Sequence, residues 1–452
     1  MKLPDTPPSI KELLLDINKD DLNKFYDVAE QYNRSYMHWE DLKYRSDSER
    51  ERRSIWALLK LMRSGNSKIK IGGISLNYAV TADFQKTLHE IDMRSSAGKF
   101  PGEKLTEREK SKYAVSSIME ESIASSQIEG ASTTRSVAKK MLREKRKPKD
   151  KSERMIVNGY QAMEFIVKMK DSELTPDLIL SIHQIIVNET LDEPKYEGAF
   201  RDYDDIFVKD AYTGDEYYHS PVTAGMIPQL MQDLCSFVND NKDFTHPIVK
   251  GIILHFLIGY IHAFDDGNGR LARSLFYWFL LKNDYWIVEY LSLSRNIKEH
   301  LGKYEMAYLL SESDDNDVTY FLQFNLSIMN EALSDFIKYL KKKRNEFEEI
   351  ELQVRSEHKL SLRQQSILID AMKTGEPFSI QEIATKYQVT YQTARIDVKD
   401  LEGKGLIKTV GKQSNQVLYE YNKSKTQGDS KPEKYSSSPK NTKLTDWNAK
   451  KT

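Results

Sequence analysis

Two apolar segments lie close together in the middle of the chain. The segments "HPIVKGIILHFLIGYI" (246–261) and "RLARSLFYWFLL" (270–281) both carry apolar residues at helical spacing. The pattern predicts two buried helices, with the nine residues "HAFDDGNGR" (262–270) as the loop between them and the second helix opening at "GNG". An imidazole, two carboxylates, two glycines and a guanidinium are therefore gathered in one short loop.

The same spacing divides the rest of the chain into modules. Residues 1–110 are predicted to form helices with polar joints, and residues 111–345 form a larger helical core. A long helix with mixed charges leads to residues 355–422, where three short amphipathic helices precede two strands. The Lys-, Ser- and Pro-rich end, 423–452, has little to bury and is predicted to be disordered. The expected fold is mainly α, with a small β-hairpin in the core and a C-terminal winged helix-turn-helix.

The loop has the elements of an anion site. Gly267 and Gly269 leave backbone N–H groups without side chains where the second helix begins, at the positive end of its dipole. Arg270 and Arg273 are three residues apart, so they are predicted to project from one face of the first turn. Their forked donors suit phosphate oxygens. The loop therefore predicts a site for several phosphates.

Two further residues of the loop can supply chemistry. Asp266 is a hard oxygen ligand, and one carboxylate plus phosphate oxygens and waters is how Mg²⁺ usually binds in nucleotide sites. His262 can accept a proton from an attacking hydroxyl near neutral pH. The alternative is that a glycine turn simply joins two helices and its charges are solvated.

The run "HAFDDGNGRLAR" resembles the signature of the Fic family, H-P-F-x-D/E-G-N-G-R-x-x-R, with Ala263 where proline is usual. Fic proteins are mostly AMP transferases, which move AMP from ATP to a Ser, Thr or Tyr hydroxyl of a protein. The resemblance implies that His262 is the base, Asp266 the Mg²⁺ ligand and Phe264 an apolar anchor of the loop. It also implies phosphate contacts from the signature's remaining polar positions: Gly267, Asn268 and Gly269 to the α and β phosphates, Arg270 near the β phosphate and Arg273 to the γ phosphate.

The resemblance also implies a regulatory segment and a flap. The helix predicted at 111–130 ends in "SSQIEGAS", in which Ser125 and Glu129 match the inhibitory S/T-x-x-x-E-G/N motif of self-restrained Fic proteins, and the glutamate pairs with Arg273. Some relatives also remove AMP with this glutamate. Residues 196–222 fit the β-hairpin flap that holds the target segment in the family, with Thr213-Gly214-Asp215 as its turn. Gly198 and Arg201 match the residues that precede this flap. The alternative is an ordinary surface hairpin.

Two binding assignments rest on weaker patterns. Tyr304, four residues from Tyr308, lies where the family commonly lines the nucleotide base, although two core tyrosines would give the same spacing. In the winged helix-turn-helix, Gln392 and Arg395 near the start of the third helix are predicted to contact DNA. The alternative is a docking or dimer module, because acidic residues on the same helix dilute the positive field, and a homodimer remains open.

The composition of the chain limits the classes of protein to which it can belong. The net charge of −1 gives no general bias towards nucleic acid. No run of about 18 apolar residues is present and the N-terminus has no apolar signal core, so neither a membrane segment nor a leader is expected. The single cysteine, Cys235, excludes an internal disulfide framework and is consistent with a cytoplasmic location.

Two functions are consistent with these observations. The favoured one is an ATP- and Mg²⁺-dependent protein adenylyltransferase that modifies a protein hydroxyl, its own included, and is restrained by Glu129. The alternative is a DNA-binding transcriptional regulator whose Fic core senses nucleotide with little catalysis, with Ala263 as the departure in its support.

Overall fold

The computed structural model divides the chain into two compact units, Met1–Lys341 and Lys342–Thr452. The division lies close to the boundary expected at residue 345. The structure describes residues 3–16, 19–95, 107–204, 207–209, 216–219, 222–240, 242–357, 360–413 and 416–422. The tail predicted to be disordered, 423–452, lies outside the described residues.

The N-terminal part of the first unit combines helices with a β-hairpin. Its own apolar cluster is built around Trp39 and Trp56. The expectation of helices alone up to residue 110 is wrong, because β1 and β2 pair as antiparallel strands on either side of Gly72 and Gly73. The elements are α1 (Ile10–Asp16), α2 (Lys19–Arg34), α3 (Trp39–Leu42), α4 (Glu49–Met62), η1 (Arg63–Gly65), β1 (Ser67–Ile71), β2 (Ile74–Tyr78) and α5 (Ala82–Ser95).

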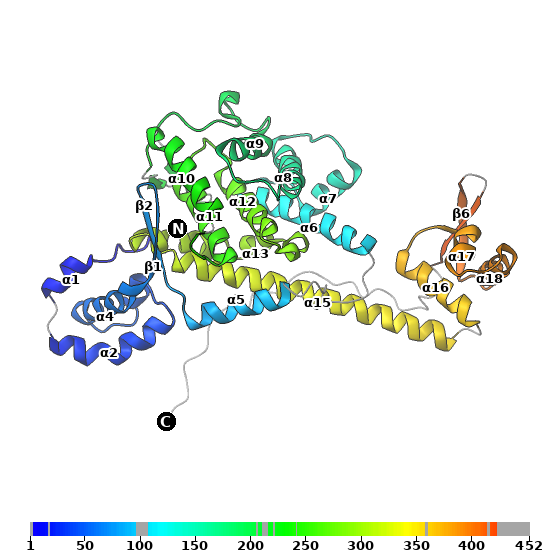
Figure 1. Cartoon of the computed structure of the whole chain (residues 1–452), viewed down its shortest axis with the longest axis horizontal. Coiled ribbons are helices and arrows are strands. Elements are labelled where there is room, and N and C mark those ends of the chain that lie inside the picture. The colour runs from blue at the N-terminus through cyan, green and yellow to red at the C-terminus, as the bar shows by residue number, and fades with distance from the viewer. Residues whose placement is uncertain are drawn as a thin grey trace, which may run out of the picture. The chain divides into compact units, whose positions relative to one another are not determined.

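The core of the first unit is built around one buried helix, α11. Its apolar residues occur on all sides, as expected for a helix covered by neighbours in every direction. Figure 1 shows α11 and α12 among α6, α8, α9 and α10. The helices are α6 (Glu107–Ile128), α7 (Arg135–Glu144), α8 (Lys151–Lys168), α9 (Pro176–Val187), α10 (Ile227–Asn239), α11 (Pro247–Ile261), α12 (Asn268–Lys282), α13 (Leu293–Glu299), α14 (Leu301–Ser313) and α15 (Thr319–Glu357).

Shorter elements connect these helices. The two strands of the predicted flap are present as an antiparallel pair with a register shift, although their turn, 210–215, lies outside the described residues. Cys235 is buried in α10 and free. The short elements are η2 (Pro194–Tyr196), β3 (Phe207–Lys209), β4 (Glu216–His219), η3 (Ala224–Met226) and η4 (Trp286–Tyr290).

The second unit contains the three helices and the hairpin expected from the sequence. Capping boxes at Ser361 and Ser379 open its first two helices, with Gln364 and Glu382 as the respective partners. A short third strand, β5, was not expected, and the sheet order is β5-β7-β6. The elements are α16 (Leu362–Thr374), β5 (Phe378–Ser379), α17 (Ile380–Lys386), α18 (Tyr391–Gly403), β6 (Ile407–Gln413) and β7 (Gln416–Tyr421).

Membrane-spanning segments were sought among the helices that the structure describes. None of them combines the length and the apolar character that a crossing of the bilayer requires.

Candidate active site

Residues 262–268 form a tight reversal between α11 and α12. His262 has a left-handed backbone (φ 50°) and ends α11, donating its N–H to the carbonyl of Ile258. Gly267 has φ 87° and precedes α12. A Cβ there would also collide with the side chain of Val187, so the position requires glycine for both conformation and space. The loop and the helix start predicted from the sequence are confirmed.

Phe264 anchors the loop from beneath. Its side chain is fully buried and stacks on His183 of α9, with ring centroids 3.8 Å apart. Asn268 holds the same residue from the other side, since its amide donates to the Phe264 carbonyl at 2.8 Å and its Oδ1 accepts from the Phe264 N–H at 3.1 Å. The phosphate contact expected of Asn268 stays a prediction. Both of its polar ends are occupied, so in this structure it braces the loop.

His262 is placed as a neutral base. Its Nδ1 lies 3.3 Å from the carbonyl of Gly259, which favours the tautomer with the proton on Nδ1. Its Nε2 has no hydrogen-bond partner among the described residues. Burial lowers the pKa of His262, because the charged imidazolium would lose its hydration. The ring can therefore accept a proton at Nε2 near neutral pH.

Arg201 holds the backbone of the loop. Its Nε donates to the carbonyl of His262 at 2.8 Å, and its backbone N–H donates to the carbonyl of Ala263 at 3.0 Å. The two terminal nitrogens donate to the carbonyls of Tyr203 and Val222, at 2.6 and 2.5 Å. One buried guanidinium thus fixes the loop to the segments that flank the hairpin β3–β4.

Arg273 of α12 is held by the end of α6. Its Nε donates to Ser125 Oγ at 2.9 Å, and its terminal nitrogen donates to Ser125 O at 3.0 Å and to Glu129 Oε1 at 2.9 Å. The guanidinium is nearly buried, whereas the Glu129 side chain is 29% exposed. The structure therefore brings together the two residues of the inhibitory motif and the second arginine of the signature.

Glu129 also covers the start of α12. A Cβ placed on Gly269 would collide with Oε1 of Glu129, so this carboxylate lies directly against the glycine backbone. α6 ends at Ile128, and Gly130 adopts a left-handed backbone (φ 89°) after it, as expected of a C-terminal glycine. The carboxylate thus occupies the place where the sequence predicted an anion.

Arg270 has other partners than Arg273, so a phosphate site formed jointly by the two arginines stays a prediction. Its guanidinium is buried, and it donates to the carbonyl of Ile186 at 3.1 Å and to Asp266 Oδ2 at 3.2 Å. Asp266 remains accessible, with 43% of its side chain exposed. The contact of Arg270 with a β phosphate stays a prediction that requires a change of partners.

Sequence reasoning missed two residues that support the loop. His183 Nε2 lies 2.9 Å from the carbonyl of Asp266, and its Nδ1 accepts from the N–H of Gly198 at 3.2 Å. Burial lowers the pKa of His183 to about 4, so it remains neutral. The Tyr203 hydroxyl donates to Asp265. No local pattern marks either contact, because the partners are far apart in the chain.

Tyr304 lies in an aromatic cluster beside Arg273. Its hydroxyl lies 2.9 Å from Nε2 of the buried His255, and its ring contacts Tyr308 and Phe321. The charge on Arg273 acts on the Tyr304 hydroxyl, which places the two side chains near each other. This environment is that of a core tyrosine, and the contact with a nucleotide base stays a prediction.

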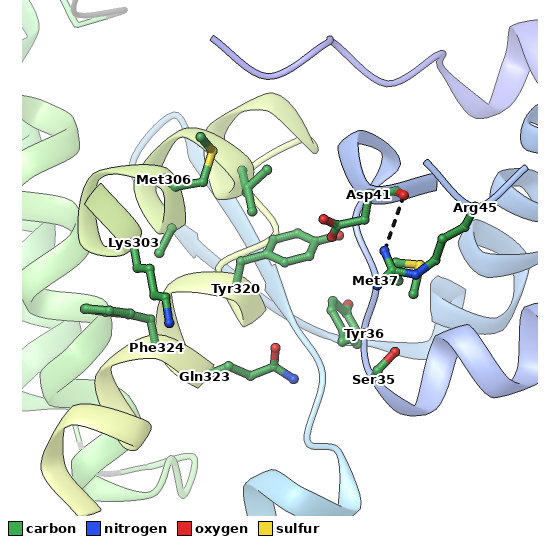
Figure 2. A pocket seen from close by; sticks show the side chains of 12 residues that line it. Ser35, Tyr36, Met37, Asp41, Arg45, Lys303, Met306, Tyr320, Gln323 and Phe324 are labelled. Atoms are coloured by element: carbon green, nitrogen blue, oxygen red, sulfur yellow. Dashed lines mark hydrogen bonds between the residues drawn. The ribbon is translucent and has the colours of Figure 1, made fainter. Parts of the chain in front are cut away.

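A pocket of about 540 Å³ lies elsewhere in the first unit. Figure 2 shows Lys303 and Met306 of α14 and Tyr320 and Phe324 of α15 on one side, with residues 35–45 opposite them. No residue of the loop 262–273 lines this pocket. It is therefore separate from the chemistry that the loop suggests.

In the second unit, the start of α18 is exposed. Tyr391, Gln392 and Arg395 all have exposed side chains. The acidic residues expected to weaken DNA binding are paired within the unit: Asp397 with Arg363, and Asp400 with Lys404. Their effect on the field at the start of α18 is therefore smaller than the sequence suggested.

Comparisons with known proteins agree with this geometry. Residues 173–280 match the model of the Fic/DOC family. The chain is 28% identical over 158 residues to "Protein adenylyltransferase Fic" of Aedes aegypti, which covers 34% of this chain and 28% of that relative. It is 25% identical over 121 residues to "Protein adenylyltransferase fic-1" of Caenorhabditis elegans, covering 26% and 22%. The matched part thus spans less than a third of each of these relatives.

A solved structure gives the same result for the fold. The crystal structure of a Fic family protein from Desulfovibrio desulfuricans matches 76% of this chain and 97% of its own, with a TM-score of 0.51 and 19% identity. At this identity the likeness concerns the fold alone. The family match covers α11, the loop and most of α12, the elements that carry His262, Asp266 and Arg273. Residues 173–280 of this chain therefore match the Fic/DOC family model.

Proposed function

We propose that this protein is a protein adenylyltransferase, which transfers AMP from ATP to a Ser, Thr or Tyr hydroxyl of a protein and is restrained by its own Glu129. The observation that carries the proposal is the single site formed by His262, Asp266 and the start of α12, with Arg273 held by Glu129 beside it. The adenylyltransferase relatives support the same class of reaction.

The reaction requires a base and a leaving group. The target hydroxyl oxygen forms a bond to the α phosphorus of ATP, and the bond from this phosphorus to the bridging oxygen of the β phosphate breaks. The proton of the hydroxyl goes to Nε2 of His262, and pyrophosphate leaves. His262 suits this role because its Nδ1 is occupied by the Gly259 carbonyl and its burial keeps it neutral.

The start of α12 and Arg273 supply the positive potential for the phosphates. The backbone N–H groups at the start of a helix bind anions, and the charged fork of Arg273 suits a terminal phosphate. Their combination favours a polyphosphate over a single carboxylate. The carboxylate of Glu129 binds Arg273 and fills the space next to Gly269. A nucleotide therefore competes with Glu129 for Arg273 and for this space.

Mg²⁺ fits the residues that are present. The described residues contain no cluster of three or more His, Cys, Asp or Glu side chains that could hold a metal ion by themselves. Asp266 offers one exposed carboxylate, and phosphate oxygens and waters would complete the shell, as is usual for this ion. When bound, Mg²⁺ would neutralise phosphate charge.

Glu129 provides the restraint. Its pair with Arg273 is nearly buried on the arginine side, and removing one partner of such a pair costs about 3–5 kcal/mol when the remaining charge is left unpaired. The γ phosphate of ATP can supply the replacement charge. Without Glu129, Arg273 keeps its bonds to Ser125 but loses its charged partner, so Glu129→Gly should let the γ phosphate take that place and raise AMP transfer.

The test uses ATP labelled in the α phosphate, with Mg²⁺ and the full chain. We expect weak labelling of the parent, strong labelling of the Glu129→Gly variant, and none when His262→Ala is added to it. Label must follow the α phosphate and be absent with ATP labelled in the γ phosphate. Glu129→Gly protein that labels neither itself nor any protein of a cell extract would overturn the proposal.

The exposed start of α18 favours a second activity for the other unit. We infer that Lys342–Thr452 is a winged helix-turn-helix that contacts DNA through Tyr391, Gln392 and Arg395. The internal pairing of Asp397 and Asp400 supports this inference. A gel shift with genomic fragments tests it. Arg395→Ala should weaken the shift, and equal binding by both proteins would exclude this surface.

A further inference from the structure

The face of α6 that carries Glu129 contains a second buried carboxylate. Ser117, Glu121, Ser125 and Glu129 follow one another at four-residue intervals, so they lie along one side of the helix and its end. We call these four residues the α6 stripe. Each of them forms a hydrogen bond with the segment between Arg273 and Ser294.

Glu121 makes the densest contacts of the α6 stripe. Its Oε2 accepts from the Tyr277 hydroxyl at 2.9 Å, from the N–H of Ser294 at 2.9 Å and from Ser292 Oγ at 3.2 Å. Its Oε1 accepts from Ser294 Oγ. The residue is 2% exposed. Four donors therefore converge on one buried carboxylate. Their contacts fix the position of α6 along its axis relative to α12 and α13.

Other contacts of the stripe depend on the same register. Tyr277 is one turn after Arg273 on α12, just as Glu121 is one turn before Ser125 on α6. Successive turns of the two helices are therefore in contact: Glu121 bonds to Tyr277, and one turn later Ser125 bonds to Arg273. A shift of α6 along its axis by one residue, about 1.5 Å, would separate Glu129 from Arg273.

The carboxylate form of Glu121 matters for these contacts. Ser294 N–H can only donate, and the hydroxyl of Ser294 donates to the other oxygen. A glutamine would place an amide donor against at least one of these groups, leaving a buried donor without an acceptor. Burial raises the pKa of Glu121, whereas donation from Ser294 and Tyr277 opposes this effect.

We propose that Glu121 is a positioning residue for autoinhibition, which holds α6 in the register where Ser125 and Glu129 reach Arg273. Its hydrogen bonds go to Tyr277, Ser292 and Ser294 rather than to the loop 262–268, and its charge also acts on Arg273. The restraint is therefore shared between the glutamate that meets Arg273 and a second glutamate two turns earlier. This inference rests on the proposed function where it is tested by AMP transfer. Where it is tested by hydrogen exchange, it rests on the structure alone.

The matched experiment compares Glu121→Gln with Glu120→Gln. Glu120 is the adjacent residue on α6 and pairs with Arg135 and Lys139 of α7. The chemical change is therefore identical, but it affects the contact with α7 and not the contacts with Tyr277 and Ser294. In AMP transfer from labelled ATP, Glu121→Gln should raise labelling by about threefold to tenfold, the range for weakening one or two buried hydrogen bonds. Glu120→Gln should leave labelling within twofold of the parent.

The double variant separates positioning from general stability. In the Glu129→Gly background, Glu121→Gln should add no further increase, because the Glu129–Arg273 pair through which the proposed restraint acts is already absent. A merely structural role would lower labelling in both backgrounds, and that result would overturn the proposal. Ser294→Ala removes one hydrogen-bond donor to Glu121 and no charge. It should also raise labelling, but by less than Glu121→Gln does.

Hydrogen exchange provides a readout that does not depend on activity. Amides of residues 122–129 should exchange faster in Glu121→Gln than in the parent, and at the parent rate in Glu120→Gln. Equal exchange in both variants would overturn the positioning role. If Glu129→Gly shows no labelling while exchange responds as expected, then the proposed function fails and the positioning role stands.

Discussion

Arg201→Ala is expected to release the loop that carries His262. The Arg201 side chain donates to three carbonyls, those of His262, Tyr203 and Val222, and its guanidinium is buried. Alanine removes the three donors that these carbonyls share with Arg201 and leaves a space in place of a buried guanidinium. The backbone bond from residue 201 to the carbonyl of Ala263 remains possible, so the loop is loosened rather than lost.

The magnitude follows from two opposing terms. Each buried carbonyl that loses its donor costs about 1–3 kcal/mol. The variant also regains the free energy that was needed to bury a charge, since burial lowers the pKa of Arg201 and its nearest carboxylate, Asp204, is exposed and 3.8 Å away. The lost hydrogen bonds exceed this gain, and we expect a net loss of about 3 kcal/mol in the free energy of unfolding.

The assay combines urea unfolding, followed by tryptophan fluorescence, with AMP transfer in the Glu129→Gly background. A displacement of His262 by about 1 Å should lower the transfer rate by about 100-fold. Arg135→Ala is the control, because its pair with Glu120 is exposed and is worth less than about 1 kcal/mol. Arg201→Ala protein within 1 kcal/mol of the parent, or with an unchanged transfer rate, would refute this account of the brace.

Three further predictions concern the loop. In the Glu129→Gly variant, the transfer rate should stay level from pH 8 to 6.5 and fall only at lower pH, because burial lowers the pKa of the base His262 and the neutral form is the active one; a fall beginning above pH 7 would contradict this. Gly267→Ala should destabilise the protein by about 2 kcal/mol or more in urea unfolding, since it meets both the left-handed backbone and Val187. Asp266→Asn should raise the Mg²⁺ concentration for half-maximal transfer about tenfold, with an unchanged requirement indicating another ligand.

Local patterns predicted the elements of the site well. The apolar spacing of residues 246–261 and 270–281 corresponds to α11 and α12, and the glycine before Asn268 begins the second helix as expected. The end of α6 at Gly130 was also visible in the sequence. Such features depend on residues within one or two turns of each other, which is the range that sequence spacing describes.

Side-chain directions could not be predicted in the same way. The spacing of Arg270 and Arg273 favours one shared site, but Arg270 donates to the carbonyl of Ile186, 84 residues away, whereas Arg273 donates to Ser125 and Glu129. Asn268 turns inward because the backbone of Phe264 offers it both a donor and an acceptor. His183 reaches Asp266 across 83 residues. These contacts are set by tertiary packing, for which one sequence gives no local signal.

The hairpin β1–β2 is a different kind of omission. Its sequence, "SKIKIGGISLNY" (67–78), alternates polar and apolar residues around two glycines, which is a recognised hairpin pattern. Helices lie on both sides of it, at 49–62 and 82–95, and their spacing dominates the pattern of this region. The turn packs against α10, since a Cβ on Gly72 would meet Leu230 and Asp233.

Glu129 and Arg273 belong to the same polypeptide, 144 residues apart. Their association is therefore unimolecular, and dilution cannot separate them. The restrained fraction of the protein should be the same at nanomolar and at micromolar concentration. Under the proposed function, control must then come from the substrate or from a ligand that acts on α6, which Glu120 joins to α7.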